Sequence, residues 1–332
     1  GIRQMDYFEA LGEITKEKFT VAVSGTNGKS TTTAMLALIL ERAGFDPTVI
    51  VGSQVPSFNE KNFRLGMSQY FVIEADEFHA HMLSLSPQMI VLTNIEEDHL
   101  DYYRDLAHIR ETFQTFIDRL PPDGQLILNA DDHVSFFELK PRVPFITYAL
   151  DGAADYQATD ISVGHDQQHF VIRRSHGESL GQFDLSVPGR FNVANALAAA
   201  TAAFELGVAK DIIYQTLAEF SGTWRRFERI SEKNDILIIS DYGHHPTAVR
   251  GTIEAARSFY PRRRLVLVFQ PHQRDRTKRL FEEFVASFDG ADVLVLPEVY
   301  HVPGRETEET IHVTSSDLVV ATLARDEERG VR

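Results

Sequence analysis

The clearest chemistry in this sequence lies in a glycine loop between an apolar run and a helical stretch. Residues 25–31 read Gly-Thr-Asn-Gly-Lys-Ser-Thr, directly after the apolar residues 19–24. In this context backbone N–H groups and a helix N-terminus point at a bound phosphate. We expect Lys29 to bridge the outer phosphates of a nucleotide, and Ser30 or Thr31 to bind Mg²⁺. The general motif has glycine at position 23, where this chain has Val23, so the loop is a shortened variant.

Two further apolar runs end in polar residues. One leads into Glu74, Asp76 and Glu77, and the other leads into residues 93–99, which end at His99. Ligands of open parallel sheets collect at the carboxyl ends of the strands, and carboxylate oxygens suit Mg²⁺. Acidic strand ends that are merely solvated are the alternative. Because the phosphate loop is expected next to these strand ends, we favour a role for their polar residues in binding a metal ion or phosphate.

Two polar groups near the middle of the chain have two interpretations each. Asn192 stands near the start of an Ala-rich helical stretch, where it is either a helix N-cap or an amide that contacts adenine. Arg225 and Arg226 follow a small-residue break at 221–222. They form either a solvated charged pair or a contact to a phosphate.

The second half of the chain carries histidines and arginines at two expected strand ends. Residues 240–247 read Ser-Asp-Tyr-Gly-His-His-Pro-Thr, and residues 269–277 read Phe-Gln-Pro-His-Gln-Arg-Asp-Arg-Thr. The paired histidines lack a third ligand at helical spacing, so zinc is disfavoured. Histidine together with Arg276, which can make a bidentate contact, suits a bound carboxylate.

The elements that must position these residues alternate between short apolar runs and longer amphipathic stretches. This rhythm is typical of buried parallel strands joined by helices. We expect strands at 19–24, 71–76, 88–94 and 125–130, helices at 31–44, 104–120 and 192–206, and an antiparallel insertion at 151–188. A second rhythm predicts strands at 236–242, 264–270 and 293–297, and helices at 247–260 and 277–288.

The predicted fold class is therefore α/β. A P-loop doubly wound parallel sheet with a small antiparallel insertion is followed by a second, Rossmann-like α/β domain. We place the domains at residues 1–222 and 223–332. The acidic run at 306–309 is interpreted as a solvated loop.

Composition excludes several classes of function. The 33 basic and 48 acidic residues give a net charge of −15, which disfavours nucleic acid and membrane surfaces as partners. No apolar run reaches the roughly 18 residues that span a bilayer. The chain has no cysteine, so it forms neither disulfides nor thiolate metal sites, which mildly favours the cytoplasm. We expect a cytoplasmic monomer or weak homodimer.

Taken together, these motifs resemble the Mur ligases, which build the peptide stem of bacterial peptidoglycan. The short loop, Asp-Tyr-Gly-His-His-Pro-Thr, and Phe-Gln-Pro-His followed by Arg-Thr carry the resemblance over nearly the whole chain. The resemblance implies ATP and Mg²⁺ as cofactors. It also implies a central ATP-binding domain and a C-terminal domain that binds an amino acid.

The resemblance also assigns roles to individual residues. Lys29, Glu74 and His99 are implied to be catalytic, and Ser30, Glu74 and His99 to bind Mg²⁺. The residues implied to hold the nucleotide are Gly25, Thr26, Asn27, Gly28, Lys29, Ser30, Thr31, Asn192, Asn195, Arg226 and Asp241. The residues implied to form the substrate pocket are Tyr242, His244, His245, His272 and Arg276.

The implied reaction joins L-alanine to the carboxylate of UDP-N-acetylmuramate through an acyl phosphate. Alternatives are a recycling ligase that adds a preformed tripeptide, a P-loop kinase, and a non-catalytic ATP-binding module. The family pattern has Ser-Asp where this chain has Phe78-His79, and arginine at Gln273, all where substrate is expected. The 332 residues do not show the family's N-terminal UDP-binding domain, or the last strand and helix of its C-terminal domain. The two interpretations are a fragment and a natural form that works without its own UDP-binding domain.

Overall fold

A computed structural model describes residues 4–100, 102–300 and 312–330. The acidic run at 306–309 lies outside the described residues. The chain forms two compact units, Gly1–Ile239 and Ser240–Arg332. The predicted domain boundary between residues 222 and 223 stays a prediction.

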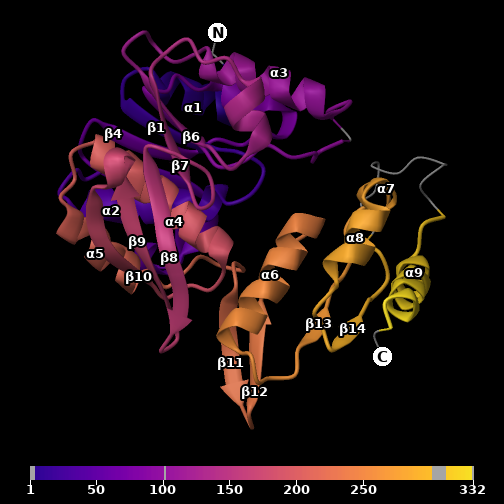
Figure 1. The fold of residues 1–332 in the computed structure, drawn as a ribbon. Coiled ribbons are helices and arrows are strands. Elements are labelled where there is room, and N and C mark those ends of the chain that lie inside the picture. Colours follow the sequence, from indigo (N-terminus) through magenta and orange to yellow (C-terminus); the bar gives the residue numbers. More distant parts are fainter. Residues whose placement is uncertain (1–3, 101, 301–311, 331–332) are drawn as a thin grey trace. The chain divides into compact units, whose positions relative to one another are not determined.

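The first unit is built on one ten-stranded sheet (Figure 1). Its strands are β1 (Phe19–Ser24), β2 (Thr48–Val55), β3 (Lys61–Arg64), β4 (Tyr70–Glu74), β5 (Met89–Leu92), β6 (Gln125–Asn129), β7 (Phe145–Ala149), β8 (Tyr156–Gly164), β9 (Gln167–Arg174) and β10 (Ser179–Leu185). The order across the sheet is β10-β9-β8-β7-β6-β5-β1-β4-β2-β3.

The strands from β2 to β8 in this order run parallel, and both ends of the sheet are antiparallel. β1 pairs in parallel with β4 on one side and with β5 on the other. β8, β9 and β10 form the predicted antiparallel insertion, which continues the sheet at one end. The doubly wound parallel sheet is therefore confirmed. It brings the carboxyl ends of β4, β1 and β5 side by side.

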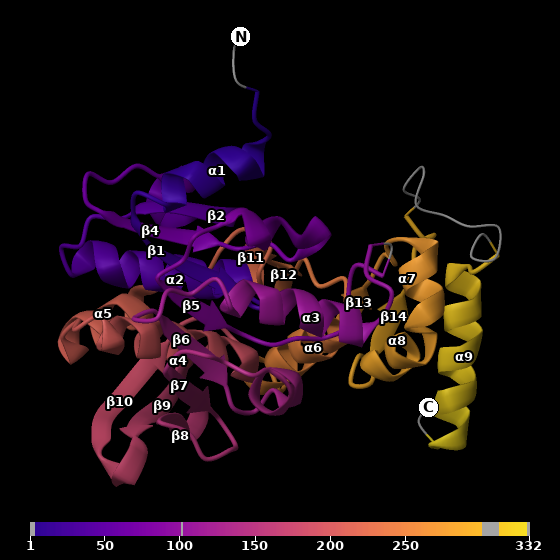
Figure 2. The same ribbon diagram turned by 90° about the horizontal axis from the view of Figure 1, so that it is seen from above.

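Helices cover both faces of this sheet (Figures 1 and 2). They are α1 (Tyr7–Thr15), α2 (Lys29–Arg42), α3 (Leu106–Ile117), α4 (Arg190–Glu205) and α5 (Lys210–Glu219), with short helical turns η1 (Pro56–Phe58), η2 (Phe78–Ser84), η3 (Val134–Glu138) and η4 (Ser175–Gly177). Because side chains alternate along a strand, Val21 and Val23 join the core under α2, α4 and α5. Ala22 joins the opposite core, with α1, η2 and α3.

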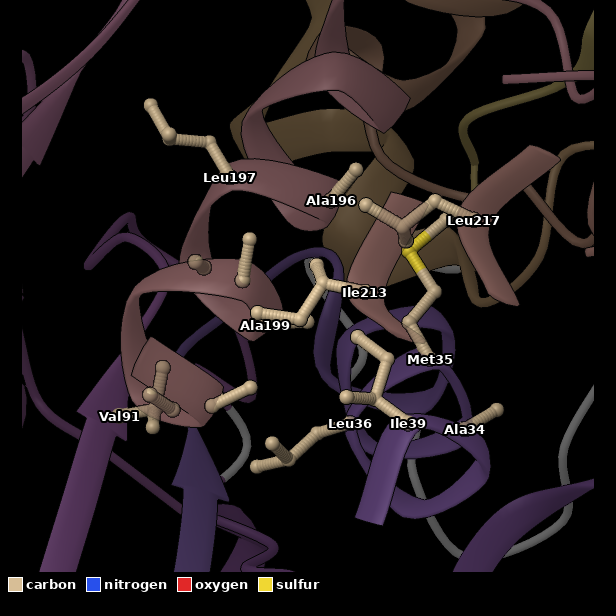
Figure 3. Close-up of a cluster of buried hydrophobic side chains, with 14 of the residues drawn as sticks. Ala34, Met35, Leu36, Ile39, Val91, Ala196, Leu197, Ala199, Ile213 and Leu217 are labelled. Carbon is tan, nitrogen blue, oxygen red and sulfur yellow. The ribbon is translucent and has the colours of Figure 1, made fainter. Parts of the chain in front are cut away.

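The core that holds the glycine loop in place is the packing of α2 against α4 and α5 (Figure 3). Figure 3 shows Met35 and Ile39 of α2 close to Ala199 of α4 and to Ile213 and Leu217 of α5. All five side chains are fully buried. The small alanines of α4 allow a close approach between helices, so α2 is enclosed between the sheet and these two helices.

The second unit is also α/β. Its elements are α6 (Pro246–Phe259), β13 (Val266–Val268), α7 (Arg274–Arg279), α8 (Phe281–Ser287), β14 (Val293–Val295) and α9 (Ser315–Glu328). β13 pairs in parallel with β14, and Val249, Phe269, Phe284 and Leu318 share one core. A second domain of strands and helices is therefore confirmed.

Two details of the strands and helices predicted for residues 236–297 differ from the structure. The helix predicted at 277–288 is divided at Leu280, whose backbone leaves helical geometry (φ −105°, ψ 29°). Among the described residues, β12 (Ile236–Ser240) pairs with β11 (Glu228–Lys233), separately from β13 and β14.

None of the described helices combines the length and apolar character that crossing a membrane requires.

Enlarging Ala199 to leucine tests the packing of α4. The added volume has no space in a fully buried interface, so we expect the free energy of unfolding of the first unit to fall by about 1–3 kcal/mol. Urea unfolding followed by the fluorescence of Trp224, the single tryptophan and part of this unit, measures it. Ala107→Leu on the exposed face of α3 is the matched control. An equal effect of the two substitutions contradicts the packing described.

Candidate functional site: a phosphate loop beside a buried carboxylate

The glycine loop follows β1 directly and leads into α2. Gly25 and Gly28 both have positive φ, 131° and 86°, which L-amino acids with side chains rarely adopt. A Cβ at Gly25 would overlap Thr93 Oγ1, and a Cβ at Gly28 would overlap Asn195 Oδ1. Glycine is therefore required at both positions by backbone geometry and by close neighbours.

The segment after β5 holds the loop from the other side. Thr26 N donates to Asn94 O at 2.8 Å, and Asn27 N donates to Asn94 Oδ1 at 2.8 Å. Glu96 N donates to Thr26 Oγ1 at 2.9 Å. The sequence predicted that the two strand ends are neighbours, and these contacts confirm it.

Lys29 begins α2, and its side chain turns back over the loop. Nζ donates to Gly25 O at 2.6 Å, to Thr26 O at 3.1 Å and to Glu77 Oε1 at 2.9 Å. Its side chain is 13% exposed and that of Glu77 is 4% exposed. All three ammonium N–H groups thus have acceptors, one of which is a buried carboxylate.

Glu74 stands at the end of β4 on the face that α2 covers. Alternation along the strand puts it on the same side as Val72, which belongs to the core under α2. Glu74 Oε1 accepts from Ser30 Oγ at 3.0 Å, and Oε2 accepts from Gly52 N at 2.5 Å. The structure therefore brings together two of the three residues predicted to bind Mg²⁺.

The third predicted metal residue, His99, lies with different carboxylates. Ligand atoms of Asp76, Glu77 and His99 all lie within 4.8 Å of one another, so this group could hold a metal ion. Glu77 Oε2 is buried and accepts no hydrogen bond, although it lies 2.8 Å from Lys29 Nζ. Two carboxylates, one of them almost fully buried, and an imidazole fit Mg²⁺ or Mn²⁺. The residues alone offered Glu74, Asp76 and Glu77 together as carboxylates for Mg²⁺, and the resemblance to the family assigned the ion to Glu74. Of these three carboxylates, the structure groups Asp76 and Glu77 with His99.

Burial dominates the electrostatics of this site. Burial raises the pKa of Glu77 from 4.5 to about 7; the charge of Lys29 lowers it in part, and Asp76 adds to the rise. Burial by itself lowers the pKa of Lys29, but its attraction to Glu77, Glu74 and Asp76 outweighs this and leaves that pKa above its ordinary value. Lys29 therefore stays charged, and Glu77 is the group that titrates near neutral pH.

The two asparagines proposed to contact adenine lie in the first two turns of α4. Asn192 is not the N-cap, which is Gly189, so that interpretation is wrong. Asn192 is buried, donates to Pro188 O at 2.6 Å, and accepts from Asn195 Nδ2 at 3.2 Å. Of the two, Asn195 also contacts Gly28 and so reaches the phosphate loop.

Arg226 lies just after Trp224, which is hydrogen-bonded to the end of β2. Trp224 N donates to Gln54 O, and Ser53 Oγ donates to Trp224 O, both at 2.9 Å. Arg226 N donates to Thr223 O at 3.1 Å, which forms a turn. The role of Arg226 at a phosphate stays a prediction.

The histidine motif of the second unit forms the start of α6. Asp241 Oδ1 accepts from Gly243 N at 2.7 Å, and the rings of Tyr242 and His244 meet edge to face at 5.1 Å. His245 is buried as the N-cap of α6, and its ring accepts from Thr247 N at 3.4 Å. The sequence did not predict that capping role.

The second motif of this unit leads from β13 into α7. The ring of His272 stacks on Tyr300 at 5.3 Å with an interplanar angle of 9°. Gln273 is the N-cap of α7 with φ 69°, and Arg276 lies within that six-residue helix. The amino-acid pocket at these residues stays a prediction.

Family comparisons agree with this geometry. Residues 23–203 match the Mur ligase middle domain, and residues 225–328 match the domain described as Mur ligase, glutamate ligase domain. The chain belongs to the Mur ligase family. Its phosphate loop lies within the first match, and its histidine motifs lie within the second.

Two relatives that are 41–43% identical to this chain carry the same name. The UDP-N-acetylmuramate–L-alanine ligase of Geobacter sp. strain M21 is 43% identical over 294 residues, which are 88% of this chain and 63% of that protein. The enzyme of the same name from Trichlorobacter lovleyi is 41% identical over 97% of this chain and 70% of its own length. The chain thus spans about two thirds of these relatives.

Solved structures of Mur ligases share the fold. The UDP-N-acetylmuramate–alanine ligase MurC of Thermotoga maritima gives a TM-score of 0.79 at 26% identity, over 96% of this chain and 67% of that one. The murein peptide ligase Mpl of Psychrobacter arcticus gives 0.68 at 27% identity, over 98% and 71%. The mixed α/β architecture of this chain is that of the family.

Glu77→Gln tests the buried carboxylate through pH. Because the folded-state pKa is raised from 4.5 to about 7, the folded protein binds this proton more tightly than the unfolded chain. Stability of the first unit therefore falls as the pH rises from about 4.5 to 7, by up to about 3 kcal/mol. In Glu77→Gln, the free energy of unfolding measured with urea should therefore fall less between pH 5 and pH 7.5 than it does in the wild type. Parallel slopes for both proteins contradict a raised pKa.

Proposed function

We propose that this chain forms the ATP-binding and amino-acid-binding part of a ligase that joins L-alanine to UDP-N-acetylmuramate. The observation that carries the proposal is the set of relatives of that name, 41–43% identical over 88–97% of the chain. The shortened phosphate loop with its buried lysine supports the use of ATP. Further proposals are a cytoplasmic location and a monomer or weak homodimer.

The proposed reaction has two steps. A carboxylate oxygen of the sugar acid attacks the γ-phosphorus of ATP, and the bond from that phosphorus to ADP breaks. The uncharged amine of L-alanine then attacks the carbonyl carbon of the acyl phosphate. The C–O bond to phosphate breaks, inorganic phosphate leaves, and the new amide nitrogen gives up a proton. Positioning and charge neutralisation supply most of the catalysis in such transfers.

The residues of the first unit suit this chemistry. Lys29 would neutralise the outer phosphates, and the loop N–H groups from Gly25 to Thr31 would hold their oxygens. Ser30, Glu74 and His99 would hold Mg²⁺, which when bound neutralises charge on the phosphates. Asp76 and Glu77, which lie close to His99, would add two further carboxylates beside that histidine. Asn195 and Asn192 would lie toward the adenine.

In the second unit, His245, His272 and Arg276 would bind the amino acid, with Tyr242 and His244 beside them. Asp241 would contact the nucleotide. Arginine can hold the carboxylate of an amino acid through two parallel hydrogen bonds, which fixes the direction of the amine. Gln273 stands where the family pattern has arginine, so the amino-acid preference itself needs measurement.

A second candidate is the recycling ligase that attaches a preformed tripeptide to the same sugar nucleotide. The similarity to a murein peptide ligase, with a TM-score of 0.68, favours it. Thr247-Ala248 after His-His-Pro also resembles the recycling ligase. The names of the relatives with 41–43% identity favour L-alanine.

Phosphate release from ATP tests the proposed activity. We expect release that requires UDP-N-acetylmuramate and L-alanine together, and a loss of at least about 100-fold in Lys29→Ala, because a preorganised charge at the transferring phosphate is lost. A panel of amino acids and the tripeptide, each added in turn, separates the two candidates. ATP binding without any substrate-dependent release would exclude a complete ligase activity for this chain.

Arg276→Ala tests the proposed amino-acid pocket. Loss of a bidentate contact to the substrate carboxylate should raise the KM for the amino acid by about tenfold or more, with a smaller change in kcat. Arg279→Ala on the same helix is the matched control, because Arg279 is exposed and pairs with Asp275 at 3.0 Å. Equal KM values for wild type and Arg276→Ala would place the pocket elsewhere.

A further inference from the structure

Glu77 is a single buried carboxylate with two potential cationic partners. One is the ammonium group of Lys29, which lies 2.9 Å from Oε1 and 2.8 Å from Oε2. The other is a divalent cation, because Glu77 belongs to a group with Asp76 and His99 that could hold a metal ion. His99 Nε2 lies 3.7 Å from Glu77 Oε1.

The two cations compete for this carboxylate. Lys29 lies close to both oxygens of Glu77, where an ion would have to coordinate. An ammonium group and a divalent ion on the same buried carboxylate repel each other strongly, because little water screens them. The described state of Lys29 therefore opposes metal binding by Glu77.

A phosphate in the loop would compete with Glu77 for Lys29. The three N–H groups of Lys29 are all engaged, two by loop carbonyls and one by Glu77. Lys29 can contact a phosphate only by giving up one of these acceptors. A phosphate bound in the loop carries negative charge, as Glu77 does. It can therefore take the place of Glu77 as the anionic partner of Lys29, whereas the two loop carbonyls can stay bound.

We propose that Glu77 is an exchange ligand. It binds Lys29 when the loop holds no phosphate, and it binds the divalent cation together with Asp76 and His99 once a phosphate has taken Lys29. Phosphate and metal then bind cooperatively without any large movement of the fold, since each removes the competitor of the other. By linkage, the factor by which phosphate strengthens metal binding equals the factor by which metal strengthens phosphate binding.

The inference rests on the proposed function only in assigning a nucleotide phosphate to the loop. Its test needs neither substrate nor turnover. An inactive chain can still show the exchange, and a failed exchange leaves the ligase proposal intact. The two proposals therefore fail separately.

The experiment measures the dissociation constant of Mn²⁺ in the absence of nucleotide, from the electron paramagnetic resonance signal of free Mn²⁺. We expect Lys29→Met to bind Mn²⁺ about tenfold or more tightly than wild type, because the competing ammonium group is gone. Adding Glu77→Gln to Lys29→Met should abolish this gain. Lys29→Gln provides a second neutral variant, and Trp224 fluorescence during urea unfolding verifies that each variant is folded.

Matched variants separate the exchange from a general change in charge. Lys61→Met removes one positive charge from the exposed strand β3 and should leave Mn²⁺ affinity at the wild-type value. Glu74→Gln in the Lys29→Met background should reduce the gain less than Glu77→Gln does. The proposal is overturned if folded Lys29→Met and Lys29→Gln both bind Mn²⁺ no better than wild type. It is also overturned if the gain survives Glu77→Gln or depends at least equally on Glu74.

Discussion

A lysine and a glutamate are buried together where β1 and β4 end, and the site of the first unit is arranged around this ion pair. Burying two charges is unfavourable unless each has close partners. Lys29 has two loop carbonyls in addition to Glu77, and Tyr103 donates to the backbone carbonyl of Glu77. The loop after β1 and the segment after β4 are therefore held to each other by charge as well as by backbone pairing.

The packing of the helices sets where this pair can form. α2 is enclosed by the sheet, α4 and α5, which fixes the backbone position of its first residue, Lys29. Asn195 of α4 contacts Gly28, which leaves no space for a side chain there. The packing of the core thus sets the position of the phosphate loop, and Gly25 and Gly28 allow its backbone conformation.

Residues that depart from the family pattern surround the carboxylates. Phe78 lies next to the ring of His99 at 4.8 Å, and His79 stacks on Tyr102 at 4.7 Å. His81 stacks on Phe8 of α1 at 3.5 Å. Aromatic rings therefore connect α1 to the acidic segment and to His99. The site of this chain has a more apolar wall than Ser-Asp at positions 78 and 79 would give.

The sequence by itself determined the strands β1, β4, β5 and β6, the phosphate loop and the closeness of these strand ends, because these follow from local patterns and from parallel pairing. It did not predict β2, β3 or β7. Alternation along β4 even places Glu74 against α2, where it meets Ser30. The pairing of β12 with β11 and the division of α7 from α8 at Leu280 were decided only in the folded chain. The grouping of Glu77 with Lys29, Asp76 and His99 was decided there too. After a strand ends, the backbone turns through positive φ at His79, Ala80 and His99, and no periodicity survives to show where the side chains point. Which carboxylate the lysine meets depends on burial and on contacts between distant segments, and those exist only in the tertiary structure.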